Sequence, residues 1–98
     1  MPEDDLQQLH MRLEGRVQGV GFRYFVYDQA LALGITGWVR NRMDGSVEVM
    51  AESRRPNLDQ FLALLRRGSR SSMVLGIHPT WKPASGEYTD FKILPTSY

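Results

Sequence analysis

Residues able to bind an anion gather in one glycine-rich stretch near the start of the chain, Gly-Arg-Val-Gln-Gly-Val-Gly-Phe-Arg at residues 15–23. Glycine adopts positive φ without strain, so Gly19 and Gly21 allow the backbone to turn its N–H groups toward one point. A helix that begins directly after this turn adds the positive end of its dipole. Such N–H groups and a helix N-terminus together form a cradle for a tetrahedral anion such as phosphate.

Arginine side chains lie on both sides of this turn. Arg23 falls in the first turn of the expected helix, and Arg16 falls on the expected strand before it. A guanidinium offers a fork of donors that fits phosphate oxygens, and a bound anion would relieve the conflict between Arg23 and the helix dipole. A tight connection without a ligand is the alternative interpretation. The stretch lacks both the Gly-Lys-Ser/Thr ending of a nucleoside-triphosphate loop and the long βαβ context of a dinucleotide site.

Composition narrows the class of protein. The chain has 98 residues, enough for one domain, and its 12 basic and 11 acidic residues give a net charge of +1, which argues against a general nucleic-acid binder. It has no cysteine, and His10 and His78 lack the spacing of metal ligands, so we expect both to be ordinary strand side chains. No apolar run approaches the ~20 residues that cross a bilayer. We therefore expect a cytoplasmic protein without a membrane segment, a metal or a cofactor.

Hydrophobic periodicity places the glycine-rich stretch between a strand and a helix. Apolar and polar residues alternate from residue 9, which predicts a half-buried strand, and residues 1–8 are expected to be a flexible N-terminal tail before a single domain over 9–98. An apolar stripe at three- and four-residue steps then predicts a helix over 22–33, with Gly34 as its C-cap.

The rest of the chain continues as strand, strand, helix and strand. Strands are predicted over 35–41 and 46–53, joined by a hairpin at Asp44-Gly45. Right-handed crossovers then place both helices on one face of an antiparallel sheet, which is the ferredoxin-like α/β sandwich (βαββαβ) of the α+β class. The remaining expected elements are a helix from Pro56 to Gly68 with Asn57 as N-cap, an edge strand over 74–81 containing Pro79, and a final strand over 88–94.

Asn41 ends the second predicted strand, which should neighbour the glycine-rich turn. An asparagine before a hairpin is common as a turn residue, and the residues alone favour that interpretation. The sequence around Asn41 favours a functional role over that of a turn residue. Gly-Trp-Val-Arg-Asn at 37–41, followed by Asp-Gly-Ser-Val-Glu-Val at 44–49, resembles the second motif of the acylphosphatase family, and residues 15–23 resemble its phosphate-binding motif.

The resemblance covers roughly residues 9–94 and becomes weaker after Ser53, where the family usually has a glycine. Residues 68–72 also depart from the family, which usually has Gly, Pro and Ala before the fourth strand. These departures leave the exit from the third strand in question, but they do not touch Arg23 or Asn41.

The resemblance implies the ferredoxin-like fold and metal-independent hydrolysis of the carboxyl-phosphate bond of small acylphosphates, with inorganic phosphate as a product. It implies that Arg23 binds the phosphoryl group and that Asn41 orients the attacking water. The phosphate-binding amides would be those of Gln18, Gly19, Val20, Gly21 and Phe22. We expect a monomer that binds neither nucleic acid nor membrane.

Two other functions compete with this one. Acylphosphatase-like domains also stand at the front of a large carbamoyltransferase of hydrogenase maturation, so the alternative is a non-catalytic module that binds phosphate or carbamoyl phosphate. Since no zinc-finger cysteines follow the domain in this chain, we expect a stand-alone enzyme. A ferredoxin-like RNA binder would need an aromatic platform on the central strands, and the outward positions of the first and third strands carry no aromatic residue.

Overall fold

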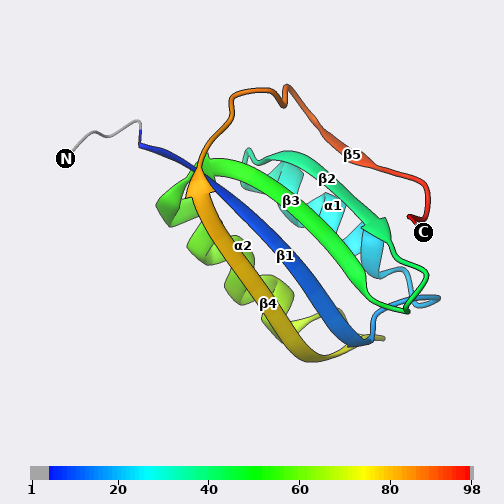
Figure 1. Ribbon diagram of the computed structural model, residues 1–98. Coiled ribbons are helices and arrows are strands. Elements are labelled where there is room, and N and C mark those ends of the chain that lie inside the picture. Colours follow the sequence, from blue (N-terminus) through cyan, green and yellow to red (C-terminus); the bar gives the residue numbers. More distant parts are fainter. Residues whose placement is uncertain (1–4, 98) are drawn as a thin grey trace.

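The chain folds as one five-stranded sheet with two helices packed on one of its faces (Figure 1). The computed structural model describes residues 5–97. In chain order the elements are β1 (Leu6–Arg16), α1 (Phe22–Ala32), β2 (Thr36–Asn41), β3 (Val47–Arg54), α2 (Arg55–Arg67), β4 (Met73–Pro83) and β5 (Phe91–Ile93). This order confirms the predicted βαββαβ arrangement with an additional strand at its end.

The strands lie in the order β4-β1-β3-β2-β5. β1 is antiparallel to β3 and β4, and β2 is antiparallel to β3. β5 pairs with β2 in parallel, so the sheet is mixed and the prediction of an antiparallel sheet is wrong for this edge. After β4 the chain crosses one end of the sheet to the opposite edge, and β5 therefore runs in the same direction as β2 (Figure 1).

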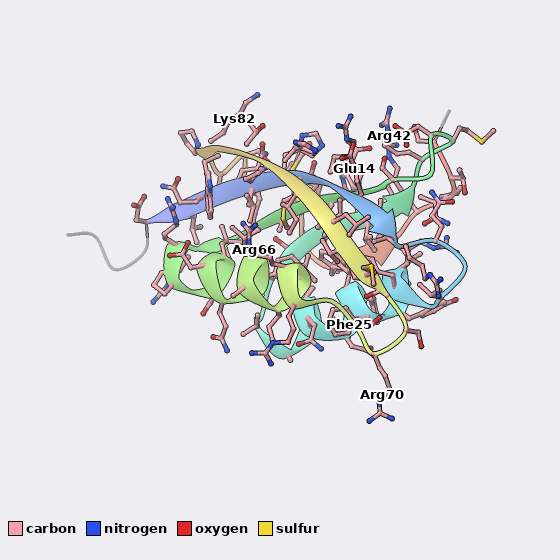
Figure 2. The ribbon with its side chains drawn as sticks, turned by 90° about the horizontal axis from the view of Figure 1, so that it is seen from below. Glu14, Phe25, Arg42, Arg66, Arg70 and Lys82 are labelled. Carbon is pink, nitrogen blue, oxygen red and sulfur yellow. The ribbon has the colours of Figure 1, made fainter. Side chains whose placement is uncertain are left out.

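The core lies between the sheet and the helices. Figure 2 shows both helices beneath the sheet, with Glu14, Arg42 and Lys82 on the face that points away from them. Each element contributes side chains at its own period, every second residue in strands and every third or fourth in helices. The largest fully buried side chains are Phe22, Phe61, Leu9, Met11, Leu13, Leu58, Leu65, Val17, Val26, Val39, Val47 and Val49.

The N-terminal strand is longer than predicted. β1 begins at Leu6 rather than at residue 9, so residues 6–8 of the expected tail belong to the sheet, where they pair with the end of β3. Residues 1–4 of that tail lie outside the described residues. β4 pairs only with β1 and is an edge strand, which confirms the edge position predicted for Pro79.

Helix α2 begins earlier than predicted. Its N-cap is Arg54 rather than Asn57, because Pro56 occupies the first turn, where a missing N–H costs no helical hydrogen bond. The Asn57 amide instead donates to the Ser53 hydroxyl at 3.2 Å. Ser53 thus remains in β3 and ties it to α2, so the departure from the family at this position is accommodated. Neither described helix is long and apolar enough to cross a membrane.

Candidate active site

The connection between β1 and α1 forms a loop with an unused set of backbone donors. We call residues 18–22 the glycine loop; Gly19 and Gly21 have φ of 73° and 75°, in the left-handed region. Val17 and Phe22 are buried at its two ends and anchor it to the core. Among the described residues, the N–H groups of residues 18–24 donate no hydrogen bond, and the first helical bond runs from the Phe25 N–H to the Gly21 carbonyl. The loop therefore presents free N–H groups.

The N-terminus of α1 carries no internal compensation for its positive end. Its N-cap is Gly21, which offers no side-chain hydrogen bond, and its first turn contains no acidic residue. Arg23 lies half-buried in that turn and forms no hydrogen bond or ion pair with another described residue. The orphan N–H groups and the positive end of the dipole lie in the same turn as Arg23, and a bound anion would compensate both.

Asn41 ends β2 with its backbone fixed and one side-chain atom unpaired. It pairs with Val47 on β3, and its carbonyl accepts a hydrogen bond from the Ser97 N–H at 2.9 Å. Its Oδ1 atom is buried and accepts no hydrogen bond from any residue in the described part of the chain. Buried acceptors are nearly always paired, because an unpaired one costs about 1–3 kcal/mol. The Asn41 carboxamide is therefore left without a protein partner for its oxygen.

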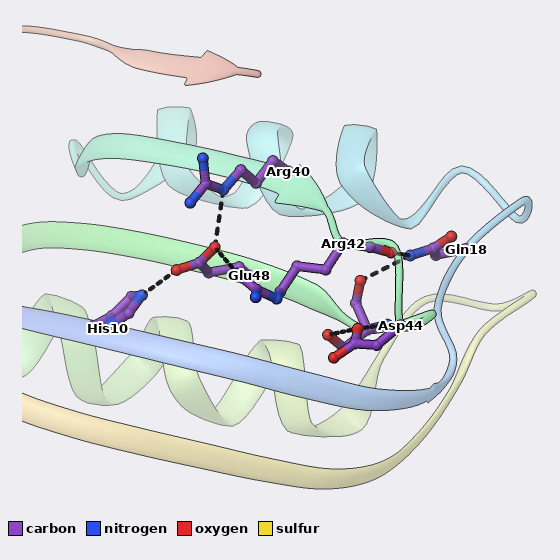
Figure 3. A network of polar contacts seen from close by, with 7 residues as sticks. His10, Gln18, Arg40, Arg42, Asp44 and Glu48 are labelled. Carbon is purple, nitrogen blue, oxygen red and sulfur yellow. Dashed lines mark hydrogen bonds and ion pairs between the residues drawn. The ribbon is translucent and has the colours of Figure 1, made fainter. Parts of the chain in front are cut away.

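Gln18 fastens the glycine loop to the turn between β2 and β3. Its Nε2 atom donates to the carbonyls of Arg42 and Ser46, each at 2.8 Å (Figure 3). The Asp44 carboxylate holds the same turn, because its Oδ1 accepts from the N–H and the hydroxyl of Ser46 at 2.9 and 2.6 Å. These hydrogen bonds also lower the pKa of Asp44 below its ordinary value. The two sequence motifs thus meet at one end of the sheet.

A cluster of charged side chains holds the residues on either side of Asn41. Glu48 is buried and accepts from Arg40 Nε at 2.8 Å, Arg42 Nη1 at 3.0 Å and His10 Nε2 at 2.6 Å (Figure 3). Burial raises the pKa of Glu48, but these three hydrogen bonds outweigh it and hold the pKa below its ordinary value. We call these four residues the Glu48 cluster.

The Glu48 cluster shows to which face of the sheet the Asn41 side chain points. Arg40 and Arg42 both reach Glu48 on the face of the sheet that points away from the helices. Successive side chains of a strand point to opposite faces, so Asn41 is turned toward the face covered by α1. The Arg40 guanidinium carbon also lies 4.6 Å from the centre of the Trp38 ring, and this cation–π contact helps to hold the Arg40 side chain on the outer face.

Sequence reasoning missed two of these features. The outward position of Glu48 on β3 is visible in the alternation, but its partners depend on the register that places it opposite Arg40 on one side and Arg12 on the other. The contacts of the Gln18 side chain have no signal in the local sequence. Arg16, the other arginine beside the loop, is exposed at the end of β1.

Within residues 5–97, no group of three or more histidine, aspartate and glutamate side chains is arranged to hold a metal ion. At the start of α1, the described groups without a protein partner are the loop N–H groups and the Arg23 guanidinium.

Comparison with known proteins gives a consistent result. The model of the acylphosphatase family matches residues 9–93. An acylphosphatase from Caldanaerobacter subterraneus subsp. tengcongensis is 42% identical over 85 residues, which cover 87% of this chain and 94% of that protein. The crystal structure of acylphosphatase from Bacillus subtilis matches with a TM-score of 0.87 and 40% identity, over 90% of this chain and 98% of that one. HypF from T. kodakarensis matches with a TM-score of 0.78 and 28% identity, over 90% of this chain but 12% of HypF.

Proposed function

The chain belongs to the acylphosphatase family, and we propose on that premise that the glycine loop, Arg23 and Asn41 form the site at which it hydrolyses acylphosphates. The products are a carboxylate and inorganic phosphate. One observation carries the assignment of the site. The uncapped N-terminus of α1, with free N–H groups and an unpaired Arg23, is tied by Gln18 to the strand end that carries the unpaired buried oxygen of Asn41.

The phosphoryl group binds at the N-terminus of α1. Its oxygens accept hydrogen bonds from the N–H groups of Gln18, Gly19, Val20, Gly21 and Phe22 and from the guanidinium of Arg23. Phosphoryl transfer passes through a loose transition state in which charge spreads over the phosphoryl oxygens, so donors fixed in advance are the main catalytic requirement. The left-handed Gly19 and Gly21 keep these donors turned toward one point.

Asn41 positions the water. Its carboxamide hydrogen-bonds to the water, whose oxygen then attacks phosphorus as the bond between phosphorus and the carboxyl oxygen breaks. The electron pair of that bond leaves with the carboxylate, and the proton of the water passes to a phosphoryl oxygen of the substrate. Neither carboxylate of the second motif is free to act as a base, because Asp44 is bonded to Ser46 and Glu48 lies on the other face of the sheet.

The leaving group needs no acid from the enzyme. Its conjugate acid titrates near the ~4 of a side-chain carboxyl, so it departs as an anion at neutral pH. The reaction thus depends on positioning and on electrostatic stabilisation, and we propose that it proceeds without a metal.

The test is hydrolysis of benzoyl phosphate in the presence of a chelator by the wild type and three variants. Inorganic phosphate, as a product, should inhibit the wild type competitively, and Arg23→Ala should abolish its binding. Asn41→Ala should lower kcat by about 10²–10³-fold with less effect on phosphate binding. Arg16→Ala is the matched control, because it removes an arginine that is exposed on the other side of the loop and should change neither quantity much.

The outcomes separate the possible functions. Unchanged hydrolysis by both Arg23→Ala and Asn41→Ala would refute the assignment of the site. A folded wild type that binds phosphate but does not turn over benzoyl phosphate would instead support the non-catalytic module. We also propose a monomer, since one chain supplies every group named above, and a cytoplasmic location; light scattering and cell fractionation test these.

A further inference from the structure

The two halves of the proposed site come from separate parts of the fold. The glycine loop and Arg23 belong to the β1–α1 connection, and Asn41 ends β2. Within the described chain, two hydrogen bonds join loop residues 18–21 to residues 41–46, and both come from the Nε2 atom of Gln18. Besides the packing of Val17 and Phe22 in the core, the hydrogen bonding between the two halves therefore depends on one carboxamide.

The geometry of this carboxamide makes the attachment rigid. A glutamine amide has two N–H donors in one plane, and both are used here, one on the Arg42 carbonyl and one on the Ser46 carbonyl, each at 2.8 Å. The acceptors are themselves fixed, because the Arg42 N–H donates to the same Ser46 carbonyl at 2.9 Å and Arg42 is anchored through its guanidinium to Glu48. Arg42 directly follows Asn41, so the glycine loop is held against the residue next to Asn41.

We propose that the Gln18 side chain is a positioning residue for hydrolysis, which holds the glycine loop where the bound phosphoryl group faces the water oriented by Asn41. This inference rests on the proposed function. The N–H groups and Arg23 all belong to one continuous segment, so they can still bind phosphate when the carboxamide is lost. What is lost is the alignment of phosphorus with the water, and a misplacement of ~1 Å at a reacting centre costs about 10²-fold in rate. The effect should therefore fall on kcat rather than on binding.

The experiment replaces the carboxamide without changing the size of the side chain. Gln18→Met keeps the length and volume but has no donor. Gln8→Met is the matched control, because Gln8 is also a half-buried glutamine whose Nε2 donates a hydrogen bond, here to Glu52 at 2.8 Å. Gln8 lies on β1 at the other end of the sheet from the glycine loop. Each variant is measured for kcat and KM with benzoyl phosphate, for inhibition by inorganic phosphate, and for its melting temperature.

We expect Gln18→Met to lower kcat by about 10- to 10²-fold with little change in the inhibition constant of phosphate. Gln8→Met should lower the melting temperature without changing kcat. In an Asn41→Ala background, Gln18→Met should have little further effect on kcat, because residues that act as a unit are not additive.

Two results would overturn the inference. One is a Gln18→Met variant with a lowered melting temperature and the kcat of the wild type, which would make the side chain merely structural. The other is an equal loss of kcat in the presence and absence of the Asn41 side chain. If Gln18→Met does not fold, Gln18→Asn decides by the same comparison, because its amide is one methylene too short to reach both carbonyls. An inactive wild type would refute the proposed function itself, which distinguishes the two failures.

Discussion

Replacing Glu48 with glutamine should destabilise the fold much more than the same change at an exposed carboxylate. The Glu48 side chain is 9% exposed and is the one counter-charge that Arg40 and Arg42 contact among the described residues. Breaking a buried ion pair typically costs ~3–5 kcal/mol. The two arginine side chains keep 30% and 33% of their surface in water, which compensates part of the loss. We therefore expect a decrease of about 2–3 kcal/mol in the free energy of unfolding.

Thermal unfolding measures this effect. In a domain of about 100 residues, 1 kcal/mol corresponds to roughly 4–8 °C in melting temperature, so Glu48→Gln should melt at least about 8 °C below the wild type at pH 7. The control is Glu14→Gln, because Glu14 also pairs with an arginine and a histidine, Arg12 at 3.0 Å and His78 at 3.1 Å, but with 48% of its side chain exposed. Exposed pairs contribute little, so the control should melt close to the wild type.

The dependence on pH gives a second, independent readout. The pKa of Glu48 in the folded protein lies below its ordinary value of 4.5, so the unfolded chain takes up the proton first as the pH falls. The stabilisation by Glu48 is therefore fully present above pH 4.5 and is lost as the pH falls through the folded pKa. The difference in melting temperature between the wild type and Glu48→Gln should accordingly shrink in acid. Equal melting temperatures of Glu48→Gln and Glu14→Gln at pH 7 would refute the reasoning. So would a difference between the wild type and Glu48→Gln that does not change in acid.

Three further changes test other parts of the structure. Gly37→Ala should lower the free energy of unfolding in urea by at least about 3 kcal/mol, because φ is 139° and a Cβ would lie 1.9 Å from the Met50 carbonyl oxygen. The control is Gly45→Ala, where the space is open, and an equal destabilisation by both variants would contradict this. Inorganic phosphate at about 100 times its Kd should stabilise the wild type by about 2.7 kcal/mol in a thermal shift assay, and an equal shift in Arg23→Ala would exclude Arg23 from the site. Glu52→Gln should speed hydrogen exchange over residues 84–90 without lowering kcat, since this carboxylate accepts from Ser85 N–H at 2.8 Å; unchanged exchange would show that it does not hold the segment.

The sequence allowed prediction of the parts of the fold that depend on local patterns. Alternation and helical periodicity predict the two helices and the central strands, and the Asp44-Gly45 turn fixes how β2 meets β3. The direction of β5 could not be predicted in this way, because the pairing of Gly37 with Phe91 depends on where the chain crosses the sheet and not on any property of residues 91–93. The start of α2 was misplaced because Asn57 has the type of an N-cap, whereas Pro56 favours a start one residue before itself.

The proposed site also has parts that the local sequence predicts and parts that it does not. Its backbone could be predicted, because positive φ at Gly19 and Gly21 follows from the residue type and the turn. The contacts that hold it together could not, because they join residues far apart in the chain. The bonds from Gln18 reach the turn after β2, and the partners of Glu48 come from β1 and from the end of β2. Only the strand register brings these side chains within hydrogen-bonding distance.

The backbone contacts that Ser97 makes beside Asn41 can form only late in the synthesis of the chain. The Ser97 N–H donates to the Asn41 carbonyl at 2.9 Å, and the Met43 N–H donates to the Ser97 carbonyl at 3.0 Å. Every group of the proposed site leaves the ribosome well before Ser97 does, and at ~5–20 residues per second the interval lasts seconds. Until then β2 lacks its parallel neighbour, and contacts between distant residues form late because closing a long loop costs entropy. The backbone contacts that fix the Asn41 carbonyl are thus among the last that the nascent chain can form.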